Sequence, residues 1–295
     1  ASYALNSSFL CLLSGTTTIS CVIPSVPTTM FWRNLCVAFL LGMSRNSLPP
    51  IIGLPLIVWP NKASAAVLFA TGKGSTALGP VFTAELQRMA AEGYVVFYDN
   101  HRGSTGYGER FALLLQGKYS SEYDFADHMS GVDALIEKGI ADPERLFITG
   151  GSAGGIASAY AIGLTNRFKA AVVAKPVINW LSKVLSADSG LYQIPFQFPG
   201  KPWDNVEHYW KRSPLSLVGN VTTPTMLITG VEDKRTPMSE TEQFYQALKL
   251  QKVDSVLVKV PGSPHGIAAK PSRMIGKIEN ILAWFKKYDS DAVKE

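Results

Sequence analysis

The chain has 295 residues, of which 46% are hydrophobic and 17% are charged, and its formal net charge is +5. This composition suits a globular core in one large α/β domain or two small ones. All 23 acidic residues follow position 84, so the positive surplus comes mainly from an acid-free N-terminal stretch. No basic patch alternates with aromatic residues, and the sequence therefore makes no case for nucleic-acid binding.

The three cysteines, Cys11, Cys21 and Cys36, all lie in the N-terminal part of the chain. Their odd number argues against a disulfide framework, and no metal-ligand spacing is present. We therefore expect no metal and no cofactor, and a reducing, cytoplasmic compartment is the default. The most apolar run, 35–43, is shorter than the roughly 20 residues that span a bilayer, so we expect no membrane span.

The N-terminal region, residues 1–64, is rich in Ser, Thr, Leu and Pro and has no clear period. It has the composition of a poorly ordered extension or of a targeting segment. The pattern changes at residue 65, where apolar runs begin to alternate with helical segments. We therefore expect an atypical extension over 1–64 and an α/β domain over 65–295.

Short apolar runs in this second part predict strands at 66–70, 94–98, 146–149, 170–174, 225–229 and 255–260. Segments with helical spacing lie between them, at 81–92, 123–138, 156–164, 239–250 and 272–288. Residues 176–214 are rich in aromatic side chains and lack a period, which predicts irregular structure. Alternating strands and helices indicate a doubly wound, mostly parallel sheet with both faces covered.

One strand is followed by Gly150-Gly151-Ser152-Ala153-Gly154, a G-x-S-x-G motif. A strand, a tight turn and a helix in that order are the context in which this motif presents a nucleophilic serine. Small residues beside Ser152 let the strand and helix approach closely. The motif therefore predicts Ser152 as a nucleophile, with the Ala153 N–H facing an oxyanion.

A serine nucleophile needs a base and an orienting carboxylate, which in this fold class follow it in the order acid, then histidine. Asp233 comes just after the strand at 225–229, and His265 just after the strand at 255–260. Glu232 is the competing acid. Loops at the carboxyl ends of parallel strands meet at one edge of the sheet, so the sequence predicts Ser152, Asp233 and His265 as a triad.

The other three histidines fit the role of general base less well than His265. His101 precedes the serine in a glycine-rich loop. His128 lies inside a predicted helix, where we expect it to be partly exposed. His208 lies in the aromatic segment and precedes the candidate acids, whereas the base is expected to follow the acid along the chain. The glycine-rich turn around Lys73 lacks the spacing of a phosphate-binding loop.

Several segments together resemble the prolyl oligopeptidase-type serine peptidases. The stretch at 100–108, NHRGSTGYG, is similar to their N-x-R-G-S-x-G-Y-G motif, and the turn at 150–155 is similar to theirs. Further similar segments are PVINW at 176–180, RSPL at 212–215, TPTMLITG at 223–230, RTP at 235–237 and PHG at 264–266. The resemblance runs continuously over 85–288 and is greatest to the acylaminoacyl-peptidase and dipeptidyl-peptidase-like branch.

This resemblance implies an α/β-hydrolase catalytic domain with Ser152, Asp233 and His265 as its triad. It also implies a second oxyanion donor, which this branch takes from an H-G-G-P loop. Here that loop reads Thr71-Gly72-Lys73-Gly74, so the Lys73 N–H would be the donor. Members of the family usually carry an N-terminal β-propeller, for which residues 1–64 are too short.

Three functions remain open from the sequence. The first is a serine peptidase acting on short peptides, with Trp180, Phe196 and Trp203 as candidates for an apolar substrate pocket or for core packing. The second is a carboxylesterase of the same fold, since fold and triad do not set the leaving group. The third is an inactive, truncated domain. The oligomeric state is also open, with a homo-oligomer among the alternatives.

Overall fold

The computed structural model describes residues 4–5, 9–14, 18–22, 63–70 and 82–289. Its centre is a parallel six-stranded sheet in the order β5-β4-β6-β7-β8-β9. The strands are β4 (Ser64–Phe69), β5 (Val95–Phe97), β6 (Ala141–Gly151), β7 (Phe168–Ala174), β8 (Thr225–Gly230) and β9 (Ser255–Val260). Each predicted strand is present, and β6 is longer than its apolar run at both ends.

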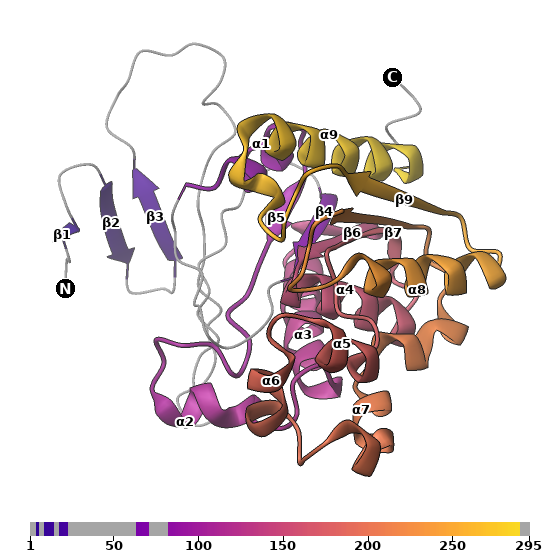
Figure 1. Ribbon diagram of the computed structural model, residues 1–295. Helices are drawn as coiled ribbons and strands as arrows, with labels where there is room; N and C mark the ends of the chain where they lie inside the picture. Colours follow the sequence, from indigo (N-terminus) through magenta and orange to yellow (C-terminus); the bar gives the residue numbers. More distant parts are fainter. Residues whose placement is uncertain (1–3, 6–8, 15–17, 23–62, 71–81, 290–295) are drawn as a thin grey trace.

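Helices cover both faces of this sheet (Figure 1). On one face lie α1 (Ala84–Ala91) and α9 (Pro271–Tyr288), and on the other lie α3 (Glu122–Glu137), α4 (Ala153–Leu164) and α8 (Met238–Leu250). Successive strand side chains point to opposite faces. Val67 and Val172, for example, pack toward α1 and α9, while Leu68 and Val173 pack toward the other layer. The apolar runs of these strands are uninterrupted because both faces of the sheet are buried.

The strand order indicates the edge of the sheet at which a binding site is expected. The chain passes from β4 to β5 on one side of β4, and then returns to place β6 on its other side. Such a reversal opens a crevice at the carboxyl ends of the two strands, where ligands bind in sheets of this kind. Ser152 directly follows β6. The prediction of a doubly wound sheet is confirmed.

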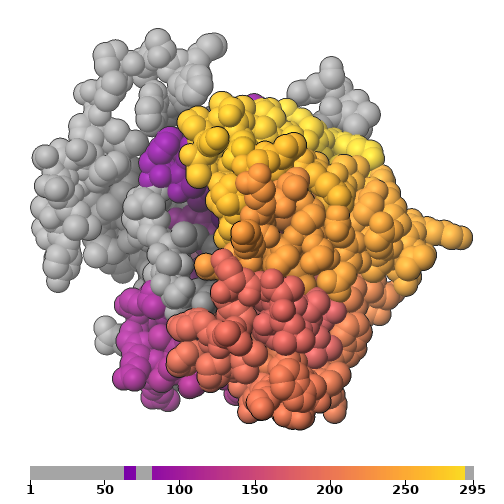
Figure 2. All heavy atoms as spheres, viewed as in Figure 1, coloured from indigo at the N-terminus to yellow at the C-terminus, as the bar shows by residue number. Residues whose placement is uncertain are grey.

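Residues 176–214 are not irregular, which corrects the sequence-based expectation. They form α5 (Trp180–Ser186), α6 (Gly190–Gln197) and α7 (Val206–Lys211), with 3-10 turns η3 (Pro202–Asp204) and η4 (Pro214–Asn220). These helices are too short to display an apolar period, and α6 contains Pro195. In Figure 2 this segment lies directly against the C-terminal part of the chain.

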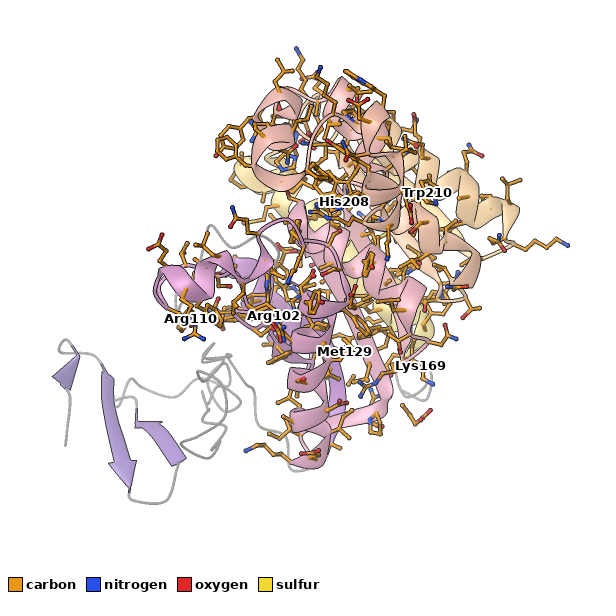
Figure 3. All side chains as sticks on the ribbon, turned by 90° about the horizontal axis from the view of Figure 1, so that it is seen from below. Arg102, Arg110, Met129, Lys169, His208 and Trp210 are labelled. Carbon is orange, nitrogen blue, oxygen red and sulfur yellow. The ribbon has the colours of Figure 1, made fainter. Side chains whose placement is uncertain are left out.

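The loop between β5 and α2 (Glu109–Ala112) is fastened to α3. Arg102 donates from its backbone N–H and its guanidinium to both carboxylate oxygens of Asp127, at 2.7–2.9 Å. Figure 3 labels Arg102 beside this helix. The arginine of the N-x-R-G-S motif therefore positions its own loop.

His128 is buried rather than partly exposed, which corrects a second expectation. Its Nδ1 lies 2.6 Å from a carboxylate oxygen of Asp99, the second residue after β5. The 99–102 loop covers a second side of α3. The apolar period of a helix indicates only the side that faces the sheet, so it did not predict the burial of His128.

Outside this sheet, the described N-terminal residues form three short antiparallel strands, β1 (Ala4–Leu5), β2 (Phe9–Ser14) and β3 (Thr18–Val22). The expected division between 1–64 and 65–295 stays a prediction. A short 3-10 turn, η2 (Leu113–Leu115), follows α2, and another, η5 (Ile267–Ala269), precedes α9.

Candidate active site

Ser152 lies in a strained turn between β6 and α4. Its φ is 61° and its ψ is −116°, in a region that L-residues rarely adopt. Strain of this kind costs about 1–3 kcal/mol and is found where the surrounding structure over-determines a site. The Ser152 N–H donates to the carbonyl of Ala174 on β7, which ties the turn to the neighbouring strand.

Two glycines make this turn sterically possible. A Cβ at Gly150 would lie 2.5 Å from the carbonyl oxygens of Ala70 and Gly154, and one at Gly155 would lie 2.4 Å from that of Ala174. No L-side chain fits at either position without moving backbone. The glycine-rich sequence therefore serves the close approach of strand and helix.

Gly155→Ala is expected to destabilise the fold by about 1–3 kcal/mol, because its methyl group overlaps the β7 backbone. Gly276→Ala is the matched control. Nothing lies within 4 Å of a Cβ at Gly276, which is in α9, so alanine there should stabilise by about 0.5–1 kcal/mol. Urea unfolding of both variants measures the difference, and equal stabilities would contradict this account.

The structure brings the three predicted residues into one hydrogen-bonded chain. His265 Nε2 lies 2.9 Å from Ser152 Oγ, and His265 Nδ1 lies 2.7 Å from Asp233 Oδ2. Each residue comes from a different segment that follows a parallel strand. This is the geometry of a nucleophile, a base and an orienting carboxylate.

Asp233 is held by a dense set of donors. Its Oδ1 accepts the backbone N–H groups of Arg235 and Thr236, both at 2.9 Å, and its Oδ2 accepts the Thr236 hydroxyl at 3.0 Å. Burial alone would raise the pKa of Asp233, but hydrogen bonds from His265 and Thr236 outweigh it and lower that pKa. Asp233 is therefore ionised at neutral pH and faces His265 as an acceptor.

The loop that carries His265 is anchored by Lys175. Its ammonium donates to the His265 carbonyl at 2.8 Å. Lys175 directly follows β7 and has a positive φ of 42°. The Thr236 hydroxyl in turn lies 3.0 Å from the Lys175 carbonyl, so Lys175 links the loops that carry Asp233 and His265.

A pocket of about 230 Å³ opens beside Ser152 and His265. Its apolar wall includes Ile156, Val177 and Trp180. Two contacts hold Trp180 in place: its backbone N–H donates to the Ser213 hydroxyl, and its ring packs edge-on against Phe198. This wall belongs to the third apolar cluster of the described residues, which is separate from the two that cover the sheet.

The three substrate-residue candidates fare differently. Trp180 lines the pocket. Phe196 is 63% exposed and Trp203 is 64% exposed, and neither is among the described residues that line it. Their sequence signal was only aromatic content, which does not distinguish a pocket wall from a surface. Other labelled residues of this region in Figure 3, His208 and Trp210, lie on α7.

The two oxyanion candidates also differ. Ala153 is the first residue of α4, so its N–H is among those that have no partner within the helix. The Lys73 N–H lies outside the described residues. Both roles stay predictions.

Several pocket residues were not singled out from the sequence. They are Tyr119, Lys183, Gln197 and Arg235, and they come from four separate segments. Arg235 stands two residues after Asp233 in the RTP segment, and the resemblance of that segment to the family gave no indication that Arg235 lines the pocket. Lys183 had no signal at all, because a lysine in an aromatic stretch looks like a surface residue.

Comparison with known proteins identifies the family. A family model described as the prolyl oligopeptidase family matches residues 80–291. The chain belongs to the prolyl oligopeptidase family. It is 37% identical over 213 residues to a Bacillus subtilis (strain 168) protein described as the uncharacterized peptidase YuxL, covering 71% of this chain and 32% of that protein. It is 33% identical over 220 residues to the acylamino-acid-releasing enzyme of Arabidopsis thaliana, covering 70% and 28%.

Solved structures agree with this family. The acylaminoacyl peptidase of Pyrococcus horikoshii superposes with a TM-score of 0.75 at 26% identity, covering 96% of this chain and 42% of that one. An acylaminoacyl peptidase in complex with Z-Gly-Gly-Phe-chloromethyl ketone gives a TM-score of 0.73 at 26% identity, covering 95% and 42%. The resemblance to this branch of the family is confirmed, and so is the α/β-hydrolase fold.

This prolyl oligopeptidase-family chain spans about a third of the length of the curated relatives it matches. Among its described residues, no helix is both long and apolar enough to cross a membrane. Within the same ranges, no three His, Cys, Asp or Glu side chains are grouped so as to hold a metal ion.

Proposed function

We propose that this chain is the catalytic part of a serine peptidase that cleaves short peptides, releasing aminoacyl or acylaminoacyl groups. The hydrogen-bonded chain from Asp233 through His265 to Ser152 carries the proposal. The family adds the reaction class, hydrolysis of peptide bonds by a serine.

The first half of the reaction forms an acyl-enzyme. His265 Nε2 takes the Ser152 proton while Oγ attacks the peptide carbonyl carbon. Asp233 accepts from His265 Nδ1, which keeps the ring oriented and stabilises the imidazolium that forms. The Ala153 N–H faces the developing oxyanion. The tetrahedral intermediate then expels the amine, which takes its proton from His265.

The second half repeats these steps with water. His265 removes a proton from water as it attacks the ester carbonyl, and the intermediate collapses to the free acid and Ser152. The pocket beside Ser152 would hold the side chain on the acyl side of the scissile bond, against Ile156, Val177 and Trp180. No cofactor enters any step.

Labelling with a fluorophosphonate probe tests the assembled triad. We expect the 295-residue protein to be labelled at Ser152 and the Ser152→Ala variant not to be. Turnover of an acetyl-aminoacyl anilide should fall by about 10⁴- to 10⁶-fold in that variant, as when a serine nucleophile is removed elsewhere. A folded wild-type protein that escapes labelling would favour the inactive-domain alternative.

A matched pair of substrates tests the leaving group. The acetyl-aminoacyl anilide requires peptidase chemistry, whereas the ester of the same acyl group is also cleaved by carboxylesterases. Turnover of both supports the proposal. Rapid ester turnover with no anilide cleavage would overturn it in favour of a carboxylesterase.

A further inference from the structure

Lys175 lies where the segments that carry the three triad residues meet. It directly follows β7, whose last residue, Ala174, accepts the Ser152 N–H at 3.0 Å. The Lys175 backbone N–H donates at 2.8 Å to the carbonyl of Ile228 on β8, the strand that leads to Asp233. Because catalysis by a triad requires fixed distances between its members, a residue at this junction can control the geometry of the site.

The Lys175 side chain crosses the turn that carries Ser152. A Cβ at Gly151 would lie 3.2 Å from Lys175 Cε, so the methylene groups run beside the residue that precedes the serine. The ammonium then reaches the His265 carbonyl at 2.8 Å. The side chain therefore spans the distance from the turn of the nucleophile to the loop of the base.

The His265 carbonyl accepts two hydrogen bonds of different kinds. One comes from the Ile267 N–H at 3.1 Å, within the same loop, and shapes that loop without fixing it to the sheet. The other comes from the Lys175 ammonium, which belongs to a different segment. A further contact between loops, from the Glu232 N–H to the Ser263 carbonyl at 3.0 Å, lies two residues before the base. The bond from Lys175 therefore holds the backbone of His265 itself to the end of β7.

The backbone and the charges around Lys175 fit this inward placement. Its φ of 42° lies in the left-handed region, where a non-glycine residue persists when the surrounding structure requires it. Asp233 and Glu85 attract its ammonium, while Lys277, which is paired with Glu85, repels it. Lys175 is thus part of the framework of the site rather than a lysine of the open surface.

We propose that Lys175 is a positioning residue of the triad, because its ammonium holds the His265 carbonyl so that the imidazole stays within reach of both Ser152 and Asp233. Lys175 is not among the described residues that line the pocket beside Ser152. Its loss should therefore slow the chemical step and leave substrate affinity unchanged. The inference rests on the triad of the proposed function, but not on which bond that triad cleaves.

The rate of fluorophosphonate labelling tests this role without a peptide substrate. We expect Lys175→Met to be labelled about 10²-fold more slowly than the wild type, since a misplacement of about 1 Å can cost that much. In the Ser152→Ala background, Lys175→Met should leave the affinity for Ac-Ala-Leu-Ala-NH₂, measured by calorimetry, unchanged. Labelling of Lys175→Met at the wild-type rate, or a loss of affinity as large as the loss of rate, would overturn the inference.

Lys234→Met is the matched control for this measurement. Lys234 is exposed and stands next to Asp233, so its replacement removes a positive charge near the triad without touching the His265 carbonyl. We expect Lys234→Met to be labelled at the wild-type rate. Slow labelling of Lys234→Met as well would show that the loss of a nearby charge, rather than the bond to His265, is what matters.

Chemical rescue separates positioning from a general structural role. Lys175→Cys treated with 2-bromoethylamine carries a thioether analogue of lysine, which restores the ammonium at the same chain length. We expect the treatment to restore most of the lost labelling rate, with treated wild type as the control for alkylation of the native cysteines. Failure of the treated, folded variant to recover would contradict the inference. If a circular dichroism melt shows that Lys175→Met does not fold, Lys175→Gln makes the same test.

Turnover of the acetyl-aminoacyl anilide separates this inference from the proposed function. Anilide cleavage and labelling that are both independent of Lys175 overturn the inference alone. Labelling that depends on Lys175, in a protein that cleaves no anilide, overturns the peptidase function alone. A folded wild-type protein that escapes labelling overturns both.

Discussion

Replacing Asp233 with asparagine is expected to lower kcat for an acetyl-aminoacyl anilide by about 10⁴-fold while the fold survives. In the proposed mechanism, the carboxylate accepts from His265 Nδ1 and thereby selects the tautomer whose Nε2 can receive the Ser152 proton. An amide at this position can turn its own N–H toward the ring and favour the wrong tautomer. Steady-state kinetics and a circular dichroism melt measure the two effects.

Glu232→Gln is the matched control for this prediction. Glu232 is the adjacent acid and is exposed, while Asp233 accepts from His265 and Thr236. We expect Glu232→Gln to keep kcat within a few-fold of the wild type. A collapse of kcat in Glu232→Gln, with Asp233→Asn active, would reassign the orienting acid.

His128 and Asp99 form a buried pair whose loss is expected to lower stability strongly. His128→Leu is expected to lower the free energy of unfolding by about 3–5 kcal/mol, since it removes one member of a buried ion pair. His128 and Asp99 are both nearly inaccessible to solvent and lie 2.6 Å apart. Burial would raise the pKa of Asp99 and lower that of His128, but their mutual attraction and hydrogen bond reverse both shifts. Urea unfolding at pH 6 measures the loss.

The double variant Asp99→Asn, His128→Gln provides the control. It keeps a polar contact but leaves no charge to be balanced, so it should lose clearly less stability than His128→Leu. A double variant that is less stable than the single one would show that the charges themselves are not what His128→Leu disturbs.

The same pair predicts the direction of a pH dependence. His128 has a raised pKa in the folded state, so its contribution is complete below its unfolded pKa of about 6.5 and is lost as the pH rises through the folded value. Asp99 has a lowered pKa, so its contribution is lost at low pH, as the pH falls from about 4 through its folded value. The difference in unfolding free energy between wild type and the double variant should therefore shrink above about pH 6.5. An unchanged difference up to pH 9 would contradict an ionised pair.

The neighbouring His101 is not expected to share this charge. Its ring stands edge-on to that of His128, with the centroids 5.0 Å apart. Burial and the adjacent His128 lower the pKa of His101. One imidazolium in this cluster is therefore favoured over two.

The parallel sheet, and the positions of Ser152, Asp233 and His265 at its edge, were predictable from the amino-acid sequence. Apolar runs such as 170–174 are buried on both faces, and that requires helices on both sides whatever the details of packing. The order Ser152, Asp233, His265 placed each residue after a strand, and parallel strands all end at the same edge. These features were predictable because the alternation of apolar runs with helical segments, and the residues that follow each run, can be read directly from the order of the chain.

The pairings between distant segments were not predictable from the sequence, because they depend on how the elements pack. Asp99 and His128 lie 29 positions apart, and no periodicity links a loop to the side of a helix that turns away from the sheet. Lys183 became a pocket residue because α5 and α6 fold over the edge where Ser152 lies, although their sequence looked irregular. Which side chains enclose a cavity depends on where several elements converge, and that is settled by packing rather than by any local property of the chain.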